Sequence, residues 1–164
     1  MGVGKTTVGR TLARQLRMPF IDADAELEKR LGVKISWIFD IEGEEGFRLR
    51  EKNILRDLVK IPQIILATGG GVVLDSENRS LLQGSGMVVY LKASPDTLYR
   101  RTKYDKNRPL LQTSNRRKKL KQLFEQRDPL YMQVADLVVR VDKKTARQVA
   151  KDIVTEVNRV GKPA

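Results

Sequence analysis

The chain has 164 residues, with 32 lysines and arginines against 20 aspartates and glutamates, which gives a net charge of +12. This length suits one domain with its own core, and no apolar run approaches the roughly 20 residues of a membrane helix. Cysteine and histidine are absent, so any general base is a carboxylate, and any metal is an oxygen-bound ion such as Mg²⁺ rather than zinc. With no signal peptide ahead of the first motif, we expect a soluble cytoplasmic protein.

The chain opens with half of a phosphate-binding loop. Its first seven residues read M-G-V-G-K-T-T, the second half of the pattern G-x-x-x-x-G-K-[ST]. In such loops backbone N–H groups wrap nucleotide phosphates, the lysine (here Lys5) contacts the β- and γ-phosphates, and the next hydroxyl (Thr6) ligates Mg²⁺. A glycine turn that only caps a helix is the alternative. The candidate nucleotide ligands are Gly2, Val3, Gly4, Lys5, Thr6 and Thr7.

The upstream half of this motif is missing. The first glycine would lie two residues before Met1, and the hydrophobic strand that normally leads into the loop is also missing. Loss of a central strand would leave its two neighbours without hydrogen-bonding partners. Two interpretations stay open: a misassigned or trimmed start, which we favour, and a chain that lacks its first strand.

Four short apolar runs are predicted strands, because parallel strands covered on both faces need uninterrupted apolar residues. They are Pro19–Ile21, Ile64–Ala67, Met87–Leu91 and Leu137–Val141. Helical patterns alternate with them, including one directly after Thr7, so we predict an α/β sandwich around a parallel sheet. Ligands bind beyond the carboxyl ends of such strands, which places the chemistry at Gly2–Thr7, Asp22–Asp24, Thr68–Gly71 and the loop after Leu91.

Two aspartates follow the first predicted strand. Asp24 is either the N-cap of a helix over Ala25–Leu31, a position that aspartate favours, or part of the site together with Asp22. In the second case, one carboxylate holds a Mg²⁺-bound water and the other accepts a proton from an attacking alcohol.

A run of three glycines follows the second predicted strand, in the sequence Thr68-Gly69-Gly70-Gly71. A plain turn needs one or two glycines, and each glycine costs conformational entropy. We therefore expect the backbone N–H groups of this run to contact a ligand.

Two arginines are candidates for binding a carboxylate. Arg48 and Glu51 are three residues apart on one helix face, which predicts either a surface ion pair or a guanidinium that Glu51 orients towards a ligand. Arg127 lies two residues before Pro129, where we expect the helix to end.

Ten of the basic residues lie between Arg100 and Lys121, against the single acid Asp105. Arg108 falls in a polar segment and is placed to close over a transferring phosphoryl group. Arg116–Lys119 is typical of a solvated helix face. No aromatic residues interrupt it, so nucleic-acid binding has no support beyond charge.

Taken together, these motifs resemble those of shikimate kinases over essentially the whole chain. They are G-x-G-K-T-T-V-G-R, D-x-D, G-F-R-x-x-E, A-T-G-G-G, R-P-L-L and E-x-R-x-P-L-Y, in the family's order. The resemblance implies one kinase domain over residues 1–164, with a substrate-binding region at about 22–55 and a lid at about 101–115. It also implies a three-layer α/β/α fold with five parallel strands in the order 2-3-1-4-5, of which this chain lacks the first.

The resemblance also implies roles for individual residues on the nucleotide side. Gly2–Thr7 would bind the ATP phosphates, with the lysine as a catalytic residue and the first threonine on Mg²⁺. Asp22 would lie near the metal. Arg108 would be a catalytic lid arginine on the phosphates, Arg101 would lie near the adenine, and Lys144 would belong to the adenine loop.

On the acceptor side, the resemblance implies that Asp24 binds the shikimate hydroxyls and is the base. Arg48 and Arg127 would hold the shikimate carboxylate, and Gly69–Gly71 would donate backbone hydrogen bonds. The expected reaction is phosphorylation of the 3-hydroxyl of shikimate by MgATP in aromatic amino-acid biosynthesis, by a monomer without nucleic-acid or membrane partners. A gluconate or nucleotide kinase, or an inactive truncated anion-binding protein, stays open as an alternative.

Overall fold

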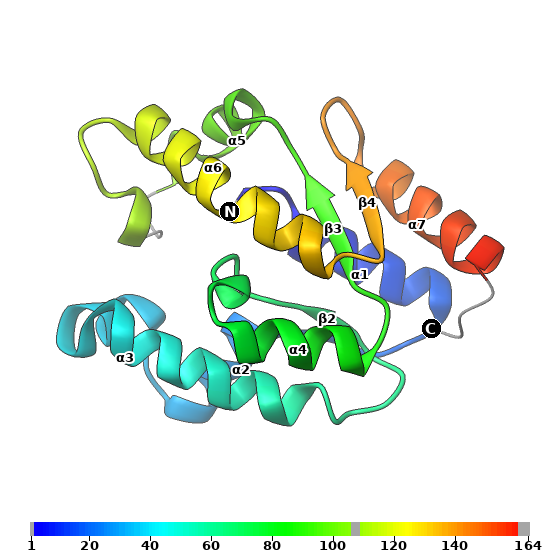
Figure 1. The fold of residues 1–164 in the computed structure, drawn as a ribbon, viewed down its shortest axis with the longest axis horizontal. Helices are drawn as coiled ribbons and strands as arrows, with labels where there is room; N and C mark the ends of the chain where they lie inside the picture. The colour runs from blue at the N-terminus through cyan, green and yellow to red at the C-terminus, as the bar shows by residue number, and fades with distance from the viewer. Residues whose placement is uncertain (1, 106–108, 161–164) are drawn as a thin grey trace.

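The structure is a computed structural model that describes residues 2–105 and 109–160 (Figure 1). Its strands are short and parallel, as the apolar runs predict. β1 (Phe20–Asp22) pairs with β2 (Ile65–Ala67), and β3 (Val89–Lys92) pairs with β4 (Leu137–Arg140). Helices alternate with the strands, which confirms the predicted α/β class.

The helices follow the predicted periodic segments, with two short 3₁₀ turns between them. None that lies within the described ranges combines the length and the apolar character needed to cross a membrane. They are α1 (Lys5–Leu16), α2 (Ala23–Leu31), α3 (Ile35–Leu58), η1 (Val72–Leu74), α4 (Ser76–Ser85), α5 (Pro95–Thr102), η2 (Pro109–Leu111), α6 (Arg116–Val134) and α7 (Ala146–Val160).

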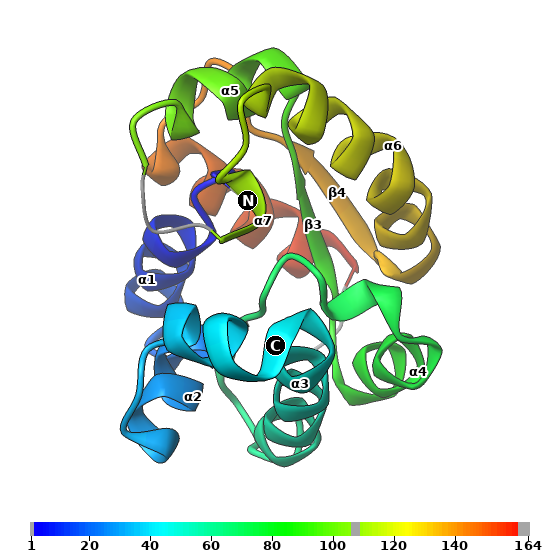
Figure 2. The same ribbon diagram turned by 90° about the vertical axis from the view of Figure 1, so that its left-hand side faces the viewer.

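The molecule has two halves, each built on one strand pair (Figures 1 and 2). In one half, α2 and α3 pack beside β1 and β2 around buried residues such as Leu27, Ile38 and Leu58. In the other, α7 packs against β4 around buried residues such as Val139 and Ile153, and it also packs against α1, which contacts β1 and β2. The core of the described residues is therefore divided into separate clusters. Besides these two, one lies around Leu55, Val73 and Val134 and another around Leu111 and Leu120.

The continuous five-stranded sheet is not formed by the described residues. They contain two separate pairs, which correspond to the expected neighbours 2-3 and 4-5. The expected central position lies between β2 and β3. The described chain begins at the loop before α1, so it supplies no extended segment for that position.

Two local features differ from the sequence interpretations. Of the two roles considered for Asp24, the N-cap is taken by Asp22: its Oδ1 accepts hydrogen bonds from the backbone N–H groups of Asp24 (3.1 Å) and Ala25 (3.3 Å), and α2 begins at Ala23 rather than Ala25. α6 also continues through Pro129 to Val134. Side-chain contacts on both sides of the proline hold this helix in place, so tertiary packing overrides the local preference.

Candidate active site

The phosphate loop is a tight turn that leads directly into α1. Gly2 and Gly4 have φ angles of +70° and +93°, a region that glycine adopts without the strain of a side chain. Lys5 is the first residue of the helix. The loop therefore places the positive end of the helix dipole and a lysine beside each other, an arrangement that binds phosphates.

The predicted metal ligands lie together. The Thr6 hydroxyl donates a hydrogen bond of 2.7 Å to Oδ2 of Asp22, while Oδ1 of Asp22 is occupied by the helix cap. These hard oxygen donors fit Mg²⁺. No cluster of three metal-binding side chains occurs among the described residues, so an ion here would complete its shell with phosphate oxygens and water, as Mg²⁺ commonly does.

The three-glycine turn after β2 packs tightly against acidic and basic side chains of α2 and α3, in the same half of the molecule. A methyl group added at Gly71 would overlap the Arg48 guanidinium, and one added at Gly69 would overlap Oε1 of Glu51 and lie 3.2 Å from Oδ1 of Asp24. This close approach is the physical reason for glycine at these two positions. It brings Asp24, Arg48 and Glu51, from two helices, against one turn.

Two side chains of α6 reach the same turn from the other half of the molecule. Nη1 of Arg127 donates a hydrogen bond of 3.1 Å to the Gly70 carbonyl, and the Tyr131 hydroxyl donates another to that oxygen. Gly70 therefore accepts hydrogen bonds through its carbonyl here, whereas sequence reasoning considered only its N–H. Burial raises the pKa of Tyr131, so its hydroxyl keeps the proton that it donates.

The Arg48–Glu51 pair is largely shielded from water. Nη1 of Arg48 lies 2.7 Å from Oε2 of Glu51, which is 4% exposed, and Nη2 lies 2.9 Å from Oε1 of Glu44. Burial raises the pKa of Glu51, and the nearby Arg48 charge only partly opposes this. Burial alone would lower the pKa of Arg48, but the Glu51 carboxylate raises it, so the guanidinium stays charged. The pair is therefore buried rather than the surface ion pair of one sequence interpretation, and the orientation of Arg48 towards a ligand stays a prediction.

Two buried polar atoms in this region have no hydrogen-bond partner within the described part of the chain. They are Nε of Arg127, whose residue is 5% exposed, and Oε1 of Glu51. Buried donors and acceptors are almost always satisfied in folded proteins. A buried donor and a buried acceptor near the same glycine turn are therefore consistent with a polar ligand.

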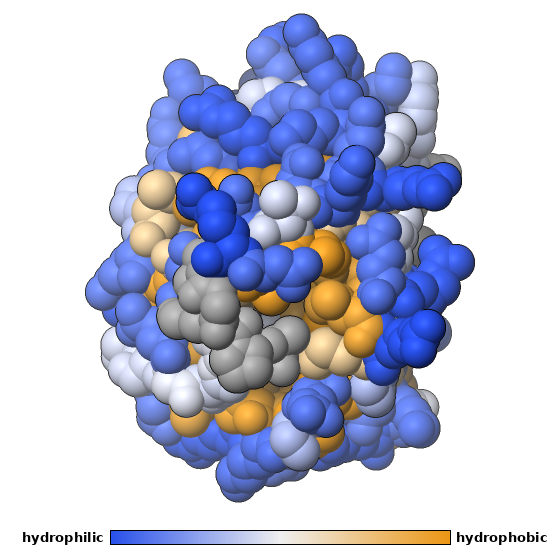
Figure 3. Space-filling view, turned by 90° about the vertical axis from the view of Figure 1, so that its right-hand side faces the viewer, coloured by the Kyte–Doolittle hydropathy of each residue, from blue (hydrophilic) through white to orange (hydrophobic). Residues whose placement is uncertain are grey.

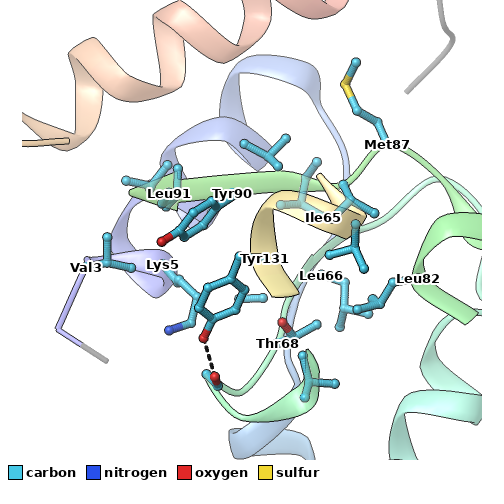
Figure 4. Close-up of a pocket in the computed structure, with 18 of the residues that line it drawn as sticks. Val3, Lys5, Ile65, Leu66, Thr68, Leu82, Met87, Tyr90, Leu91 and Tyr131 are labelled. Atoms are coloured by element: carbon cyan, nitrogen blue, oxygen red, sulfur yellow. Dashed lines mark hydrogen bonds between the residues drawn. The ribbon is translucent and has the colours of Figure 1, made fainter. Parts of the chain in front are cut away.

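The phosphate loop and the glycine turn open onto one cavity of about 520 Å³ (Figure 4). Lys5 lines it from the loop, Gly69 and Gly70 from the turn, and Arg127 and Tyr131 from α6. In the close-up, the Lys5 ammonium and the Tyr131 hydroxyl point into the same space. The structure thus brings Lys5 and Arg127 to one cavity, while Asp24 and Arg48 approach the same glycine turn without being among the residues that line it.

The predicted adenine and lid residues lie at the edge of the site. The Arg101 guanidinium donates hydrogen bonds to the carbonyls of Val3 (3.1 Å) and Val141 (3.3 Å), so it joins the phosphate loop to the segment after β4. Nζ of Lys144 pairs with Asp152 at 2.7 Å. Arg108 lies outside the described residues.

Sequence reasoning missed Tyr131 and a polar network beside it. Tyr131 is four residues after Arg127 and therefore on the same helix face, a signal that could have indicated it. In the network, Asp128 accepts hydrogen bonds from Tyr90 (2.9 Å) and Lys92 (2.8 Å) of β3. These bonds fix α6 on the strand and hence the position of Arg127.

Arg116 also departs from the solvated helix face expected for Arg116–Lys119. Its guanidinium donates to the carbonyls of Leu111 (3.2 Å) and Thr102. It therefore ties η2 to α5, while Arg117 remains exposed and pairs with Asp96 at 2.6 Å. Nothing in the sequence pattern distinguishes these two neighbouring arginines.

A glycine loop that leads into a helix beginning at Lys5, a Thr6–Asp22 pair beside it and two arginines on a neighbouring glycine turn are typical of a P-loop kinase. The comparisons with known proteins agree with this class. The shikimate kinase family model matches residues 1–158. The chain belongs to the shikimate kinase family.

Individual relatives support this assignment. The chain is 56% identical to the shikimate kinase of Nitrosospira multiformis over 93% of this chain and 78% of the relative, and 54% identical to that of Vibrio parahaemolyticus over 94% and 90%. The structure of the Acinetobacter baumannii shikimate kinase in complex with shikimate superposes with a TM-score of 0.95 at 45% identity, over 97% of this chain and 89% of that one. A Sinorhizobium meliloti gluconokinase, 17% identical with a TM-score of 0.62, shares the fold alone.

Proposed function

We propose that the chain transfers the γ-phosphoryl group of ATP to the 3-hydroxyl of shikimate, giving shikimate 3-phosphate and ADP. Family membership and the solved relative that holds shikimate support this substrate. The observation that carries the proposal is the shared cavity, because Lys5 of the phosphate loop and Arg127 of α6 both line it. A phosphate donor and an anionic acceptor can therefore meet there.

The acceptor carboxylate binds between Arg48 and Arg127. Both guanidinium groups contact the glycine turn, Arg48 against Gly71 and Arg127 on the Gly70 carbonyl. Two guanidinium groups on one turn suit a planar carboxylate, which each can bind through a charge-assisted hydrogen bond. The free Nε of Arg127 is a donor available for this ligand.

Asp24 is the base for the acceptor hydroxyl. It lies in the first turn of α2, with Oδ1 beside the glycine turn. This places it beside the proposed position of the shikimate ring. The chain has no histidine or cysteine, so a carboxylate is the available proton acceptor. Asp24 would orient the hydroxyl and take its proton as the new P–O bond forms.

The nucleotide side provides charge rather than covalent chemistry. Gly2–Thr7 holds the phosphates, Lys5 neutralises the charge that develops on the transferring group, and Arg108 does so from the lid. Mg²⁺ bound by Thr6 and near Asp22 would supply further neutralisation of phosphate charge. The cytoplasmic location and the monomeric state expected from the resemblance stay predictions.

A coupled ADP-release assay tests the proposed function. We expect turnover with shikimate that saturates, requires Mg²⁺, and exceeds turnover with gluconate or AMP by at least tenfold. Gluconate or AMP as the preferred acceptor would replace the proposed substrate. A folded chain that releases no ADP with any of the three would support the inactive anion-binding alternative.

A further inference from the structure

Two polar residues of α4 turn inward rather than towards water. On the face shown in Figure 3, hydrophilic residues surround a hydrophobic middle and face solvent. Asn78, in contrast, is 2% exposed, and Arg79 is partly buried. Both side chains end on backbone carbonyls of the 3₁₀ turn η1, which directly follows the glycine turn. They are therefore placed to act on that turn.

The glycine turn and η1 form one hydrogen-bonded unit. The Val72 N–H donates to the Gly69 carbonyl (3.4 Å), and the Leu74 N–H donates to the Gly71 carbonyl (3.0 Å). Gly71 is the glycine against which the Arg48 guanidinium packs. A shift of η1 would therefore move the backbone that contacts one of the two proposed carboxylate-binding arginines.

Side chains of α4 supply partners for all three carbonyls of η1. Nδ2 of Asn78 donates to the Val72 carbonyl (3.1 Å). Nη1 of Arg79 donates to the carbonyls of Val73 (2.7 Å) and Leu74 (3.2 Å). Carbonyls at the end of a short helix have no partner within that helix. Because Val72 and Val73 are each 2% exposed, loss of these donors would leave buried acceptors unpaired.

The start of α4 is also fixed to the helix that carries Arg48. Oδ2 of Asp75, the N-cap residue of α4, lies 3.0 Å from Nζ of Lys52 on α3. Lys52 comes one helical turn after Arg48, and it also pairs with Glu77 of α4 at 2.7 Å. α4 therefore connects α3 to η1, and so links Arg48 to the backbone that its guanidinium contacts.

We propose that Asn78 and Arg79 are positioning residues for the acceptor site. They do not touch the substrate; they hold η1, and through it the glycine turn at which Arg48 and Arg127 meet the acceptor carboxylate. This role rests on the proposed function, because the carboxylate is that of shikimate. In a purely structural role, the same bonds would stabilise the fold without changing the affinity for shikimate.

The test compares two substitutions of Arg79 that keep a long side chain. Arg79→Met removes the donors, whereas Arg79→Lys keeps a positively charged donor. We expect Arg79→Met to raise KM for shikimate about five- to twentyfold, with kcat and KM for ATP within about twofold of the wild type. Arg79→Lys should restore most of the affinity. The control is Arg56→Met, because Arg56 pairs with Glu77 on the same helix rather than with η1, and its KM for shikimate should stay unchanged.

Hydrogen exchange of the Leu74 amide tests the same bonds without a substrate. This amide donates to the Gly71 carbonyl, so its exchange in Arg79→Met should be at least about tenfold faster, while the amides of α7 keep their wild-type rates. Asn78→Leu, which has a similar size and no donor, should show the same faster exchange and the same rise in KM for shikimate.

An unchanged KM for shikimate in Arg79→Met and Asn78→Leu would overturn the inference even if the melting temperature falls, because the bonds would then be only structural. Equal rises in KM for shikimate and for ATP would also overturn it, as would a lysine variant as impaired as the methionine variant. A folded wild type that does not phosphorylate shikimate would instead refute the proposed function. The exchange rates of the Leu74 amide would then still decide whether Arg79 holds the turn.

Discussion

The phosphate loop (Gly2–Thr7) and the proposed shikimate-binding pocket, called the acid pocket below, are built in opposite ways. The loop is one uninterrupted stretch, Gly2–Thr7, whose function lies in local backbone geometry. The pocket takes Asp24 from α2, Arg48 from α3, a glycine turn after β2 and Arg127 from α6. A contiguous site tolerates changes elsewhere in the chain, whereas a dispersed site depends on how two halves of the molecule pack. Variants should therefore separate the two regions by which kinetic constant they change.

The largest effect is expected at the loop, where Lys5→Ala should lower kcat about 100- to 1000-fold, because a charge aimed at the transferring group is lost. Shikimate affinity, measured by calorimetry, should change less than threefold. The control is Lys151→Ala, an exposed lysine of α7. A normal kcat for the Lys5→Ala variant would contradict the proposal that the lysine of the phosphate loop takes part in phosphoryl transfer.

The next effect is expected at the arginines of the pocket. Arg127→Ala and Arg48→Ala should each raise KM for shikimate roughly 10- to 150-fold, since each charge-assisted hydrogen bond contributes about 1.5–3 kcal/mol. KM for ATP should stay within threefold. Arg127→Lys, which keeps the positive charge, is the control for a general loss of folding in the Arg127→Ala variant. Unchanged shikimate kinetics in both alanine variants would refute the assignment of the pocket.

Gly71→Ala tests whether close packing, rather than chain flexibility, requires glycine in the turn. The added methyl group overlaps the Arg48 guanidinium, so KM for shikimate should rise about tenfold and stability should fall by about 1–3 kcal/mol. Gly84→Ala is the matched control, because nothing lies within 4 Å of that site in α4. It should gain about 0.5–1 kcal/mol from helix propensity. Equal behaviour of the two variants in urea denaturation and steady-state assays would contradict this view.

Tyr131→Phe should have a smaller effect on the same pocket. It removes one of two hydrogen bonds to the Gly70 carbonyl, and Arg127 keeps the other. A loss of about 1 kcal/mol corresponds to roughly a fivefold rise in KM for shikimate, with KM for ATP unchanged. A rise in KM for ATP alone would place Tyr131 on the nucleotide side.

The smallest effect is a change in the pH dependence of stability. Burial raises the pKa of Glu51 above its value in the unfolded chain, so the folded state holds this proton more tightly. The resulting stability is complete below the unfolded pKa and is lost as pH rises through the folded pKa. Glu51→Gln should remove this fall in stability with rising pH. Free energies of unfolding measured by urea denaturation from pH 4 to 8 would show the difference. Exposed Glu45→Gln should follow the wild type, and a Glu51→Gln curve that also follows it would contradict the buried-carboxylate account.

The sequence predicts the loop and the strands well because their signals are local. Four apolar runs become four strands, and Gly4-Lys5 begins a helix. The sequence made Arg48 and Arg127 separate candidates for binding a carboxylate. Only the family resemblance paired them, since nothing in their spacing brings them to one turn. The Asp22 cap is a local interaction, and local rules allow either of the two neighbouring aspartates to make it. The continuation of α6 past Pro129 depends on tertiary contacts that local rules do not contain. The roles of individual site residues remain predictions.

The central claim is that the loop and the dispersed pocket act as one site across a shared cavity. It is tested most directly by a crystal structure of the protein with shikimate, ADP and Mg²⁺. The account predicts the shikimate carboxylate between Arg48 and Arg127, a ring hydroxyl at Asp24, and that hydroxyl facing the phosphates at Lys5. A carboxylate bound away from both guanidinium groups, or a hydroxyl turned away from the nucleotide, would contradict it.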